Sequence, residues 1–139
     1  MDITFYGAAG GVTGSKHLID YGDGRLLLDC GMWQGLSDTK ARNRIIPFAP
    51  DSVDAVVLSH AHIDHSGMLP LLVKRGFTGP IYATPATKDV VKYMLADTAK
   101  IERYDAEYRT KHKIGAPDER EPLFSEKDVD KTIEQLETI

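Results

Sequence analysis

The sequence of 139 residues predicts a layered α/β or α+β domain. Short strand-like segments come first along the chain, and predicted helices and strands alternate after them. The composition is that of a globular protein, because 42% of the residues are hydrophobic and 27% are charged. The sequence has no repeat, low-complexity segment or internal boundary, so residues 1–139 are expected to form one unit with a modest core.

Three strands are predicted before Cys30. Residues 2–6 alternate apolar and polar side chains, which is the period of a strand. Residues 7–15 then contain four glycines, which permit tight or left-handed backbone. Residues 17–21 and 25–29 form the second and third strands, and the Asp-Gly pair between them is typical of a hairpin turn.

The middle of the chain is predicted to hold a loop, two strands and a short helix. A polar loop covers residues 31–52, and residues 54–59 form a strand apolar enough to be buried on both faces. A short helix covers about residues 67–75, with Pro70 in its first turn and a glycine at its end. Residues 81–83 form the next strand.

Two further helices are predicted in the second half of the chain. Thr84 caps a long helix that begins at Pro85 and runs to about Lys113. Residues 125–128 resemble a capping box at the start of a final helix. Each helix has an apolar stripe at roughly helical spacing. The stripes consist of Val90 or Val91, Met94, Thr98, Ile101 and Tyr108 in the long helix, and of Val129, Ile133 and Leu136 in the final helix.

Composition and charge exclude several classes of protein. No apolar run approaches the roughly 20 residues that cross a bilayer, and residues 1–6 do not resemble a signal peptide. We therefore expect no membrane partner and a cytoplasmic location. Cys30 is the single cysteine, which excludes an internal disulfide and a cysteine-rich zinc finger. The net charge of −4 argues against a broad nucleic-acid surface but leaves a local basic patch open.

Three histidines and an aspartate fall within residues 60–65, directly after an apolar run. Imidazole and carboxylate groups are ligands of zinc-like metals, and a solvated polar loop does not explain their spacing. His60 and His62 can point the same way in extended backbone. Asp64 and His65 then open a helix and can face a second point nearby. We therefore expect His60 and His62 on one metal ion, and Asp64 and His65 on another.

Two such ions, about 3.5–4 Å apart, would form a hydrolytic site in which water is activated at neutral pH. Asp29 ends the third predicted strand. It could orient a ligand histidine by accepting its second ring proton, as outer carboxylates commonly do. It could equally be a turn or cap acid at the end of a strand. Its position in the sequence favours neither role.

The pattern His60-x-His62-x-Asp64-His65 resembles the signature of the metallo-β-lactamase fold, in which two sheets are sandwiched between helices (αββα). Further segments resemble the β-CASP branch of that superfamily, which contains RNA-processing nucleases similar to the cleavage and polyadenylation endonuclease and to prokaryotic RNases. These segments are residues 7–15, 27–35, 60–67, 79–87, 105–108 and 121–124.

The resemblance implies roles for particular residues. Asp29 matches the family's first conserved acid, and with Asp64 it is expected to be catalytic. The four donors of residues 60–65 match the metal-binding motif, so the complete protein would hold two Zn²⁺ ions. The loop of Thr13, Gly14 and Ser15 resembles a segment that borders the cleft, where its amides and hydroxyls could bind a substrate phosphate. A plain glycine turn is the alternative for that loop.

The sequence departs from the family pattern in one respect. The third-motif histidine, the bridging aspartate and the β-CASP insertion would all lie beyond Ile139. His17 and His112 match no ligand position and are expected at a strand start and a helix end. Four donors shared by two ions leave each with about two, whereas catalytic zinc usually has three.

The resemblance therefore implies the N-terminal part of a longer metal-dependent RNA phosphodiesterase, an endonuclease, a 5′ exonuclease or both. By itself the chain would have partial or no metal occupancy and little activity. Half of a two-sheet sandwich would also expose apolar surface, so the chain should depend on a missing C-terminal region or associate with itself. Two alternatives remain, a small-molecule hydrolase of the same fold and a non-catalytic binding or assembly module.

The long helix mixes lysines and arginines with three tyrosines, Tyr93, Tyr104 and Tyr108. Cations beside aromatic faces suit single-stranded RNA. Acids that include Asp97, Glu102, Asp105 and Glu107 share the helix, however, and a solvated face with helical ion pairs is the favoured alternative.

Overall fold

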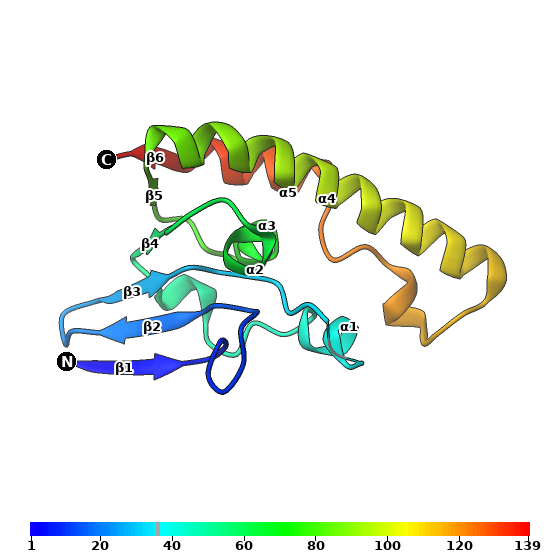
Figure 1. Ribbon diagram of the computed structural model, residues 1–139, viewed down its shortest axis with the longest axis horizontal. Coiled ribbons are helices and arrows are strands. Elements are labelled where there is room, and N and C mark those ends of the chain that lie inside the picture. Colours follow the sequence, from blue (N-terminus) through cyan, green and yellow to red (C-terminus); the bar gives the residue numbers. More distant parts are fainter. Residues whose placement is uncertain (36) are drawn as a thin grey trace.

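A six-stranded mixed sheet organises the fold, and its strands lie side by side in chain order (Figure 1). The structure is a computed structural model that describes residues 1–35 and 37–139, so Leu36 of the predicted 31–52 loop lies outside the described residues. The first two strand pairings are antiparallel and the other three are parallel. The strands are β1 (Asp2–Phe5), β2 (His17–Asp20), β3 (Arg25–Leu28), β4 (Ala55–Val57), β5 (Ile81–Ala83) and β6 (Leu136–Thr138).

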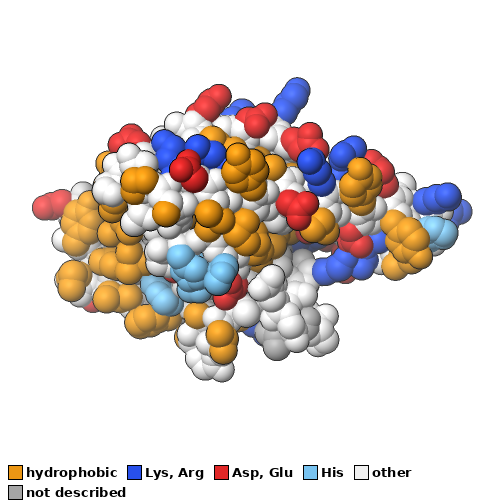
Figure 2. Space-filling model, turned by 45° about the horizontal axis from the view of Figure 1, so that its top comes forward, with side chains coloured by type: hydrophobic (Ala, Val, Ile, Leu, Met, Phe, Trp, Pro, Cys, Tyr) orange, Lys and Arg blue, Asp and Glu red, His pale blue; other side chains and the backbone are white. Residues whose placement is uncertain are grey.

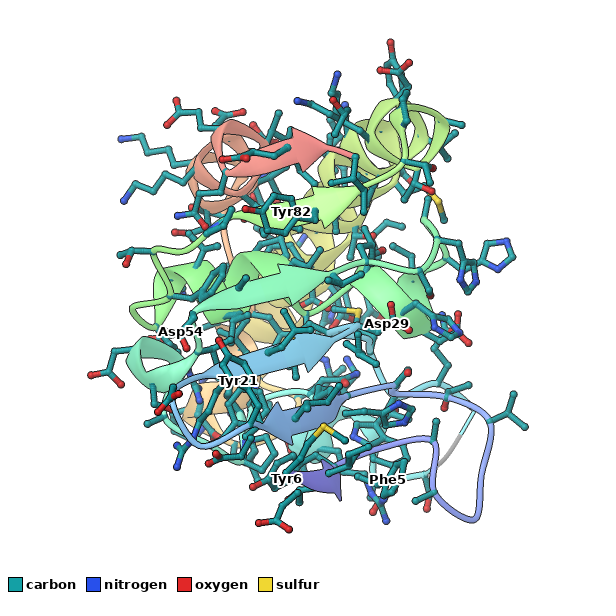
Figure 3. All side chains as sticks on the ribbon, turned by 90° about the vertical axis from the view of Figure 1, so that its left-hand side faces the viewer. Phe5, Tyr6, Tyr21, Asp29, Asp54 and Tyr82 are labelled. Carbon is teal, nitrogen blue, oxygen red and sulfur yellow. The ribbon has the colours of Figure 1, made fainter. Side chains whose placement is uncertain are left out.

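Helices of varied length lie in the connections that follow β3. The α-helices are α1 (Thr39–Arg42), α2 (Ile63–Ser66), α3 (Leu69–Lys74), α4 (Pro85–His112) and α5 (Glu126–Glu134), and the 3₁₀ helices are η1 (Pro50–Ser52) and η2 (Pro117–Arg120). Helices α2, α3, α4 and α5 lie on one side of the sheet, as Figures 1 and 3 both show. The predicted α/β class is confirmed. One sheet with helices on one face is one half of the predicted αββα sandwich.

The core lies between the sheet and these helices. One side chain from each of β2 to β6 forms a row across the sheet, because paired strands place registered residues on the same face. The row consists of Leu18, Leu27, Val56, Ile81 and Leu136, and all five are buried. Leucines and Phe77 from α3 and its flanks, together with Phe124 and Val129, close the core from the helical side.

The opposite face of the sheet is not covered by any helix of the described residues. Figure 3 looks onto this face. The next registered row crosses it, from Phe5 through His17, Leu28 and Val57 to Tyr82. Phe5 is 59% exposed, and the other four residues of the row are partly exposed. This face has exposed apolar surface, as was expected, and its covering by further protein stays a prediction.

The long helix begins and ends where the sequence predicts, but its buried side differs from the prediction. The Thr84 hydroxyl accepts the Thr87 amide at 3.3 Å, and Lys113 ends the helix with a left-handed φ of 54°. The expected stripe began at Val90 or Val91, and Val91 is the buried one of the two. Ile101 and Tyr108 were expected on the same side, and both are exposed. The buried residues in the second half of the helix are both alanines. The buried residues of α4 are Thr87, Val91, Leu95, Ala99 and Ala106.

The C-terminal segment confirms one expectation and corrects another. Ser125 and Asp128 form the predicted capping box. Leu136 was expected in the apolar stripe of the final helix, and this expectation is wrong. Helix α5 ends at Glu134, and Leu136 begins strand β6. Leu136 pairs with Ile81 of β5. Its spacing from Ile133 suits a helix, and only the long-range pairing decides otherwise.

The connection after β4 is also more divided than expected. Its predicted single helix is replaced by two, α2 and α3, and the second begins at Leu69 rather than Gly67. Asp64 and His65 open a helix as predicted, since α2 begins at Ile63. Within the described ranges 1–35 and 37–139, every helix is too short or too polar to span a membrane.

Candidate metal centre

The predicted donors gather at the carboxyl ends of the neighbouring parallel strands β3 and β4. Ligand sites of open α/β sheets commonly form at such ends. Asp29 follows β3 directly, and Figure 3 shows it at that end. His60 and His62 follow β4, and Asp64 and His65 lie in α2. Figure 2 shows histidine side chains gathered at the surface beside an Asp or Glu side chain.

His60 and His62 form the first donor pair. The Nε2 atom of His60 lies 3.1 Å from Nδ1 of His62. Two nitrogens that are each 2.0–2.1 Å from a tetrahedral zinc ion lie roughly 3.3 Å apart. His62 has an extended backbone, with φ −58° and ψ 145°, which allows both rings to turn toward one point. The spacing of the two nitrogens fits two ligands of one ion.

Asp64 and His65 form the second donor pair. The Oδ2 atom of Asp64 lies 3.6 Å from Nε2 of His65. This separation is slightly wider than the tetrahedral estimate and still suits a carboxylate and an imidazole that share one ion. The His65 ring also lies against that of His60, with 4.0 Å between ring centroids, so the two pairs are adjacent.

Asp29 is a buried acceptor that receives four hydrogen bonds. His65 Nδ1 contacts Asp29 Oδ2 at 2.8 Å. The amide of Ser59 donates at 2.8 Å and its hydroxyl at 2.9 Å, and the Ser15 hydroxyl donates at 3.3 Å. Asp29 has a left-handed φ of 59°, which aspartate tolerates better than most residues. The histidine contact that one of its two predicted roles requires is therefore present.

Backbone hydrogen bonds hold helix α2 against the loop that follows β3 and against Ser15, which precedes β2. The Cys30 amide donates to the His65 carbonyl at 2.8 Å, and the Ser15 amide donates to the Asp64 carbonyl at 2.9 Å. The backbone of Gly31 lies so close to the backbone of Asp64 that a Cβ atom on residue 31 would be 1.6 Å from the Asp64 carbonyl oxygen. These contacts fix the direction in which Asp64 and His65 project.

The predicted substrate loop is tied into the same framework. The Ser15 side chain is 2% exposed and its hydroxyl is directed to Asp29. Thr13 Oγ1 donates to the Gln34 carbonyl at 3.2 Å and accepts the Gln34 amide at 3.1 Å. The Gly14 carbonyl accepts a hydrogen bond from Lys16. Substrate binding by Thr13, Gly14 and Ser15 stays a prediction.

Lys16 is a structural residue that the sequence reasoning missed. Its side chain is 1% exposed, and its ammonium group donates to the carbonyls of Gly14 and Gly31. Burial lowers the pKa of this lysine, because a charge is costly away from water. Cys30 is also fully buried, and burial raises the pKa of its thiol to about 12, so the thiol is neutral at physiological pH.

The remaining histidines lie outside the cluster, as expected. His17 begins β2, where its ring meets that of Phe5 at 5.0 Å between centroids. His112 ends α4 and packs on Tyr108 at 4.4 Å.

The charged side chains of the long helix form several ion pairs. Arg109 contacts Asp105 at 3.0 Å, Lys92 contacts Asp89 at 3.3 Å, and Arg103 contacts Glu126 at 3.6 Å. These contacts support the solvated ion-pair alternative for that face. RNA contact by the exposed tyrosines stays a prediction.

The four donors are arranged as two pairs. Among residues 1–35 and 37–139, the structure contains no group of three or more His, Cys, Asp or Glu side chains placed to hold one metal ion. A catalytic zinc ion usually has three protein ligands. Each pair could therefore begin a coordination shell, but a complete shell needs further donors.

Comparison with known proteins gives matches over most of the chain. The sequence model of the metallo-beta-lactamase superfamily matches residues 9–139. Ribonuclease TTHA0252 of Thermus thermophilus is 50% identical over 102 residues, which are 73% of this chain and 23% of that protein. Cleavage and polyadenylation specificity factor 73 of Drosophila melanogaster is 32% identical over 140 residues, which are 100% of this chain and 19% of that protein.

A further relative also matches over part of its own length. Transcription termination factor FttA of Methanosarcina mazei is 36% identical over 97 residues, which are 68% of this chain and 15% of that protein. The chain thus spans between 15% and 23% of the length of these relatives. Among solved structures, the Rm3 metallo-beta-lactamase superposes with a TM-score of 0.44 and 26% identity, over 62% of this chain and 30% of that one.

Proposed function

The chain belongs to the metallo-beta-lactamase superfamily, and from that premise we propose that it contributes to the metal-dependent hydrolysis of RNA phosphodiester bonds. The observation that carries the proposal is the arrangement of two adjacent donor pairs with Asp29 against one of them. Two donor pairs that bound metal ions independently would not need to lie beside each other. A hydrolytic centre in which two ions act on one substrate needs its two donor pairs to be adjacent.

The residues of the chain have distinct roles in this proposal. His60 and His62 would hold one ion through Nε2 and Nδ1, and Asp64 and His65 would hold the other. Asp29 accepts a hydrogen bond from Nδ1–H of His65, and in the neutral ring this leaves Nε2 free to bind metal. Zinc ions bound here would supply Lewis acidity to a substrate phosphate.

The names of the relatives support RNA as the substrate class. One is a ribonuclease, one is a cleavage and polyadenylation factor, and one is a transcription termination factor. We propose endonuclease or 5′ exonuclease activity, or both, in a cytoplasmic protein. Phosphate contacts from the loop of Thr13 to Ser15 are part of the same proposal.

Ligand counting adds a further element to the proposal. Each ion would have two donors in the described residues, which is one fewer than catalytic zinc usually takes. We propose that residues outside this chain complete both shells. The chain alone would then bind zinc weakly and have little activity.

The uncovered sheet face supports the same conclusion. Its apolar row through Leu28, Val57 and Tyr82 lacks a covering helix in the described part of the chain. We propose that further protein covers this face, and that a second copy does so when the chain is alone. Sedimentation velocity would then show concentration-dependent association, and a monomer at all concentrations would contradict it.

The test of function compares turnover of an RNA oligonucleotide and of a thioester in the presence of zinc. The test uses two proteins. One is this chain alone, and the other is a longer protein in which this chain is joined to the residues proposed to complete the two metal shells. RNA cleavage by the joined protein should depend on zinc and be lost in His62→Ala. His112→Ala is the matched control, because His112 lies at the end of α4 away from the cluster.

Two outcomes would contradict the proposal. Thioester turnover without RNA cleavage would indicate a small-molecule hydrolase of the same fold. Full zinc occupancy without turnover of either substrate would indicate a non-catalytic binding or assembly module.

A further inference from the structure

Ser59 lies between Asp29 and the first donor pair. Its amide donates to Asp29 Oδ1 at 2.8 Å, and its hydroxyl donates to Asp29 Oδ2 at 2.9 Å. The same hydroxyl oxygen lies 3.0 Å from Nδ1 of His60. The serine therefore contacts both oxygens of the carboxylate and one ring of the first donor pair, and its hydroxyl oxygen also lies 3.5 Å from Nδ1 of His65.

The number of protons determines the direction of these hydrogen bonds. A serine hydroxyl has one proton, and an ionised carboxylate can only accept. The proton of Ser59 is therefore donated to Asp29. The contact with His60 is then a hydrogen bond only if Nδ1 of His60 carries a proton and donates it to the hydroxyl oxygen.

In the neutral imidazole, a proton on Nδ1 leaves Nε2 of His60 without one. That nitrogen is the atom that lies 3.1 Å from Nδ1 of His62. Asp29 also contacts Nδ1 of His65 directly at 2.8 Å, which leaves Nε2 of His65 free in the same way. A neutral imidazole binds metal through its unprotonated nitrogen.

We propose that Ser59 is a positioning residue that transmits the effect of the Asp29 carboxylate to His60. One acid then sets the tautomer of a histidine in each donor pair, directly at His65 and through the serine hydroxyl at His60. The consequence for metal binding rests on the proposed function. The tautomer itself does not, because the contacts that set it are present without a metal.

Ser15 provides a matched control. Its hydroxyl also donates to Asp29 Oδ2, at 3.3 Å. It has no hydrogen bond to any histidine ring among the described residues. Ser15→Ala removes one hydrogen bond from Asp29 and leaves the path to His60 intact, whereas Ser59→Ala removes that path.

The test is long-range ¹H–¹⁵N NMR of the metal-free chain with ¹⁵N-labelled histidine, at a pH at which the imidazoles are neutral. We expect His60 to carry its proton on Nδ1 in the wild type, in Ser59→Thr and in Ser15→Ala. In Ser59→Ala we expect the proton to move to Nε2. A wild-type His60 protonated on Nε2 would overturn the proposal whether or not the variants fold, and so would an Nδ1 proton retained in Ser59→Ala.

Zinc affinity is the second measurement, made by competition with a chelator. Loss of an outer-shell partner typically costs about 10- to 100-fold in metal affinity. We expect a loss of this size in Ser59→Ala and affinity close to the wild type in Ser59→Thr. A changed tautomer with unchanged affinity would overturn the link to metal binding. A wild-type chain with the Nδ1 tautomer that binds no zinc would support the proposed tautomer and contradict the weak zinc binding that the proposed function assigns to this chain.

Discussion

The Oδ2 atom of Asp29 lies 2.8 Å from Nδ1 of His65, although 36 residues separate them in the chain. Parallel pairing of β3 with β4 brings the end of one strand beside the helix that follows the other. The acid is 6% exposed, so the hydrogen bond forms away from competing water. This contact links the fold of the sheet to the orientation of a proposed metal ligand.

Replacing Asp29 by asparagine should weaken zinc binding by about 10- to 100-fold, which is the usual effect of removing an outer-shell carboxylate. Asparagine tolerates the left-handed φ of this position, so the backbone should be retained. Asp89→Asn is the control, since the Asp89 side chain is 76% exposed and forms an ion pair with Lys92. Chelator competition measures both, and equal affinities would rule out an orienting role for Asp29.

Leu27 and Leu28 test the one-sided packing of the sheet. They are neighbours in β3 that point to opposite faces, and Leu27 is 0% exposed in the core. Leu27→Ala should lower the free energy of unfolding by about 2–5 kcal/mol, as leucine-to-alanine changes in cores do. Leu28→Ala should cost less, because Leu28 is partly exposed on the uncovered face. Urea denaturation gives both values, and an equal loss would show that both faces are covered.

Gly31→Ala should disrupt the site and the fold together. The new Cβ atom would lie 1.6 Å from the carbonyl oxygen of Asp64, which requires α2 to move. Gly11→Ala is the matched control because a Cβ atom there meets nothing within 4 Å. We expect Gly11→Ala to change the free energy of unfolding by less than about 0.5 kcal/mol. Wild-type stability in Gly31→Ala would contradict the described contact between this loop and α2.

The Asp105 carboxylate should stabilise the fold at neutral pH but not in acid. Burial would raise its pKa, but hydrogen bonds and charges from Lys40 and Arg109 outweigh burial and lower it. A lowered pKa in the folded state means that stability is present above the unfolded value of about 3.9 and is lost as pH falls through the folded value.

Asp105→Asn should therefore be less stable than the wild type at pH 7, and the difference should shrink in acid. The effect should be small, since both the Asp105 and Lys40 side chains are close to half exposed. Urea denaturation across this pH range measures the difference. A difference that stays constant with pH would show that the ion pairs do not stabilise the fold.

Local signals in the sequence were sufficient to predict parts of the fold. Thr84 and Ser125 cap their helices through contacts with residues three positions later, so the sequence alone locates both helix starts. Leu136 shows the opposite case. Its spacing suits a helix, but pairing with Ile81 in β5 places it in a strand, and a local pattern contains no information about that partner.

The site shows the same division. His60, His62, Asp64 and His65 are close in sequence, and their positions beside one another follow from that. The roles of Ser59 and Lys16 depend on partners from other parts of the chain, and a serine or lysine beside a strand carries no distinctive signal. The exposed side chains of Ile101 and Tyr108 show that helical spacing alone does not tell along its whole length which side of α4 meets the core.

A zinc titration followed by NMR of the histidine rings tests the proposed metal centre most directly. The chain has five histidines, and two of them, His17 and His112, lie outside the cluster and serve as internal controls. We predict saturable shifts of the ring nitrogens of His60, His62 and His65, with His17 and His112 unchanged. Shifts confined to His17 or His112, or none in the cluster at saturating zinc, would contradict a metal centre at residues 60–65.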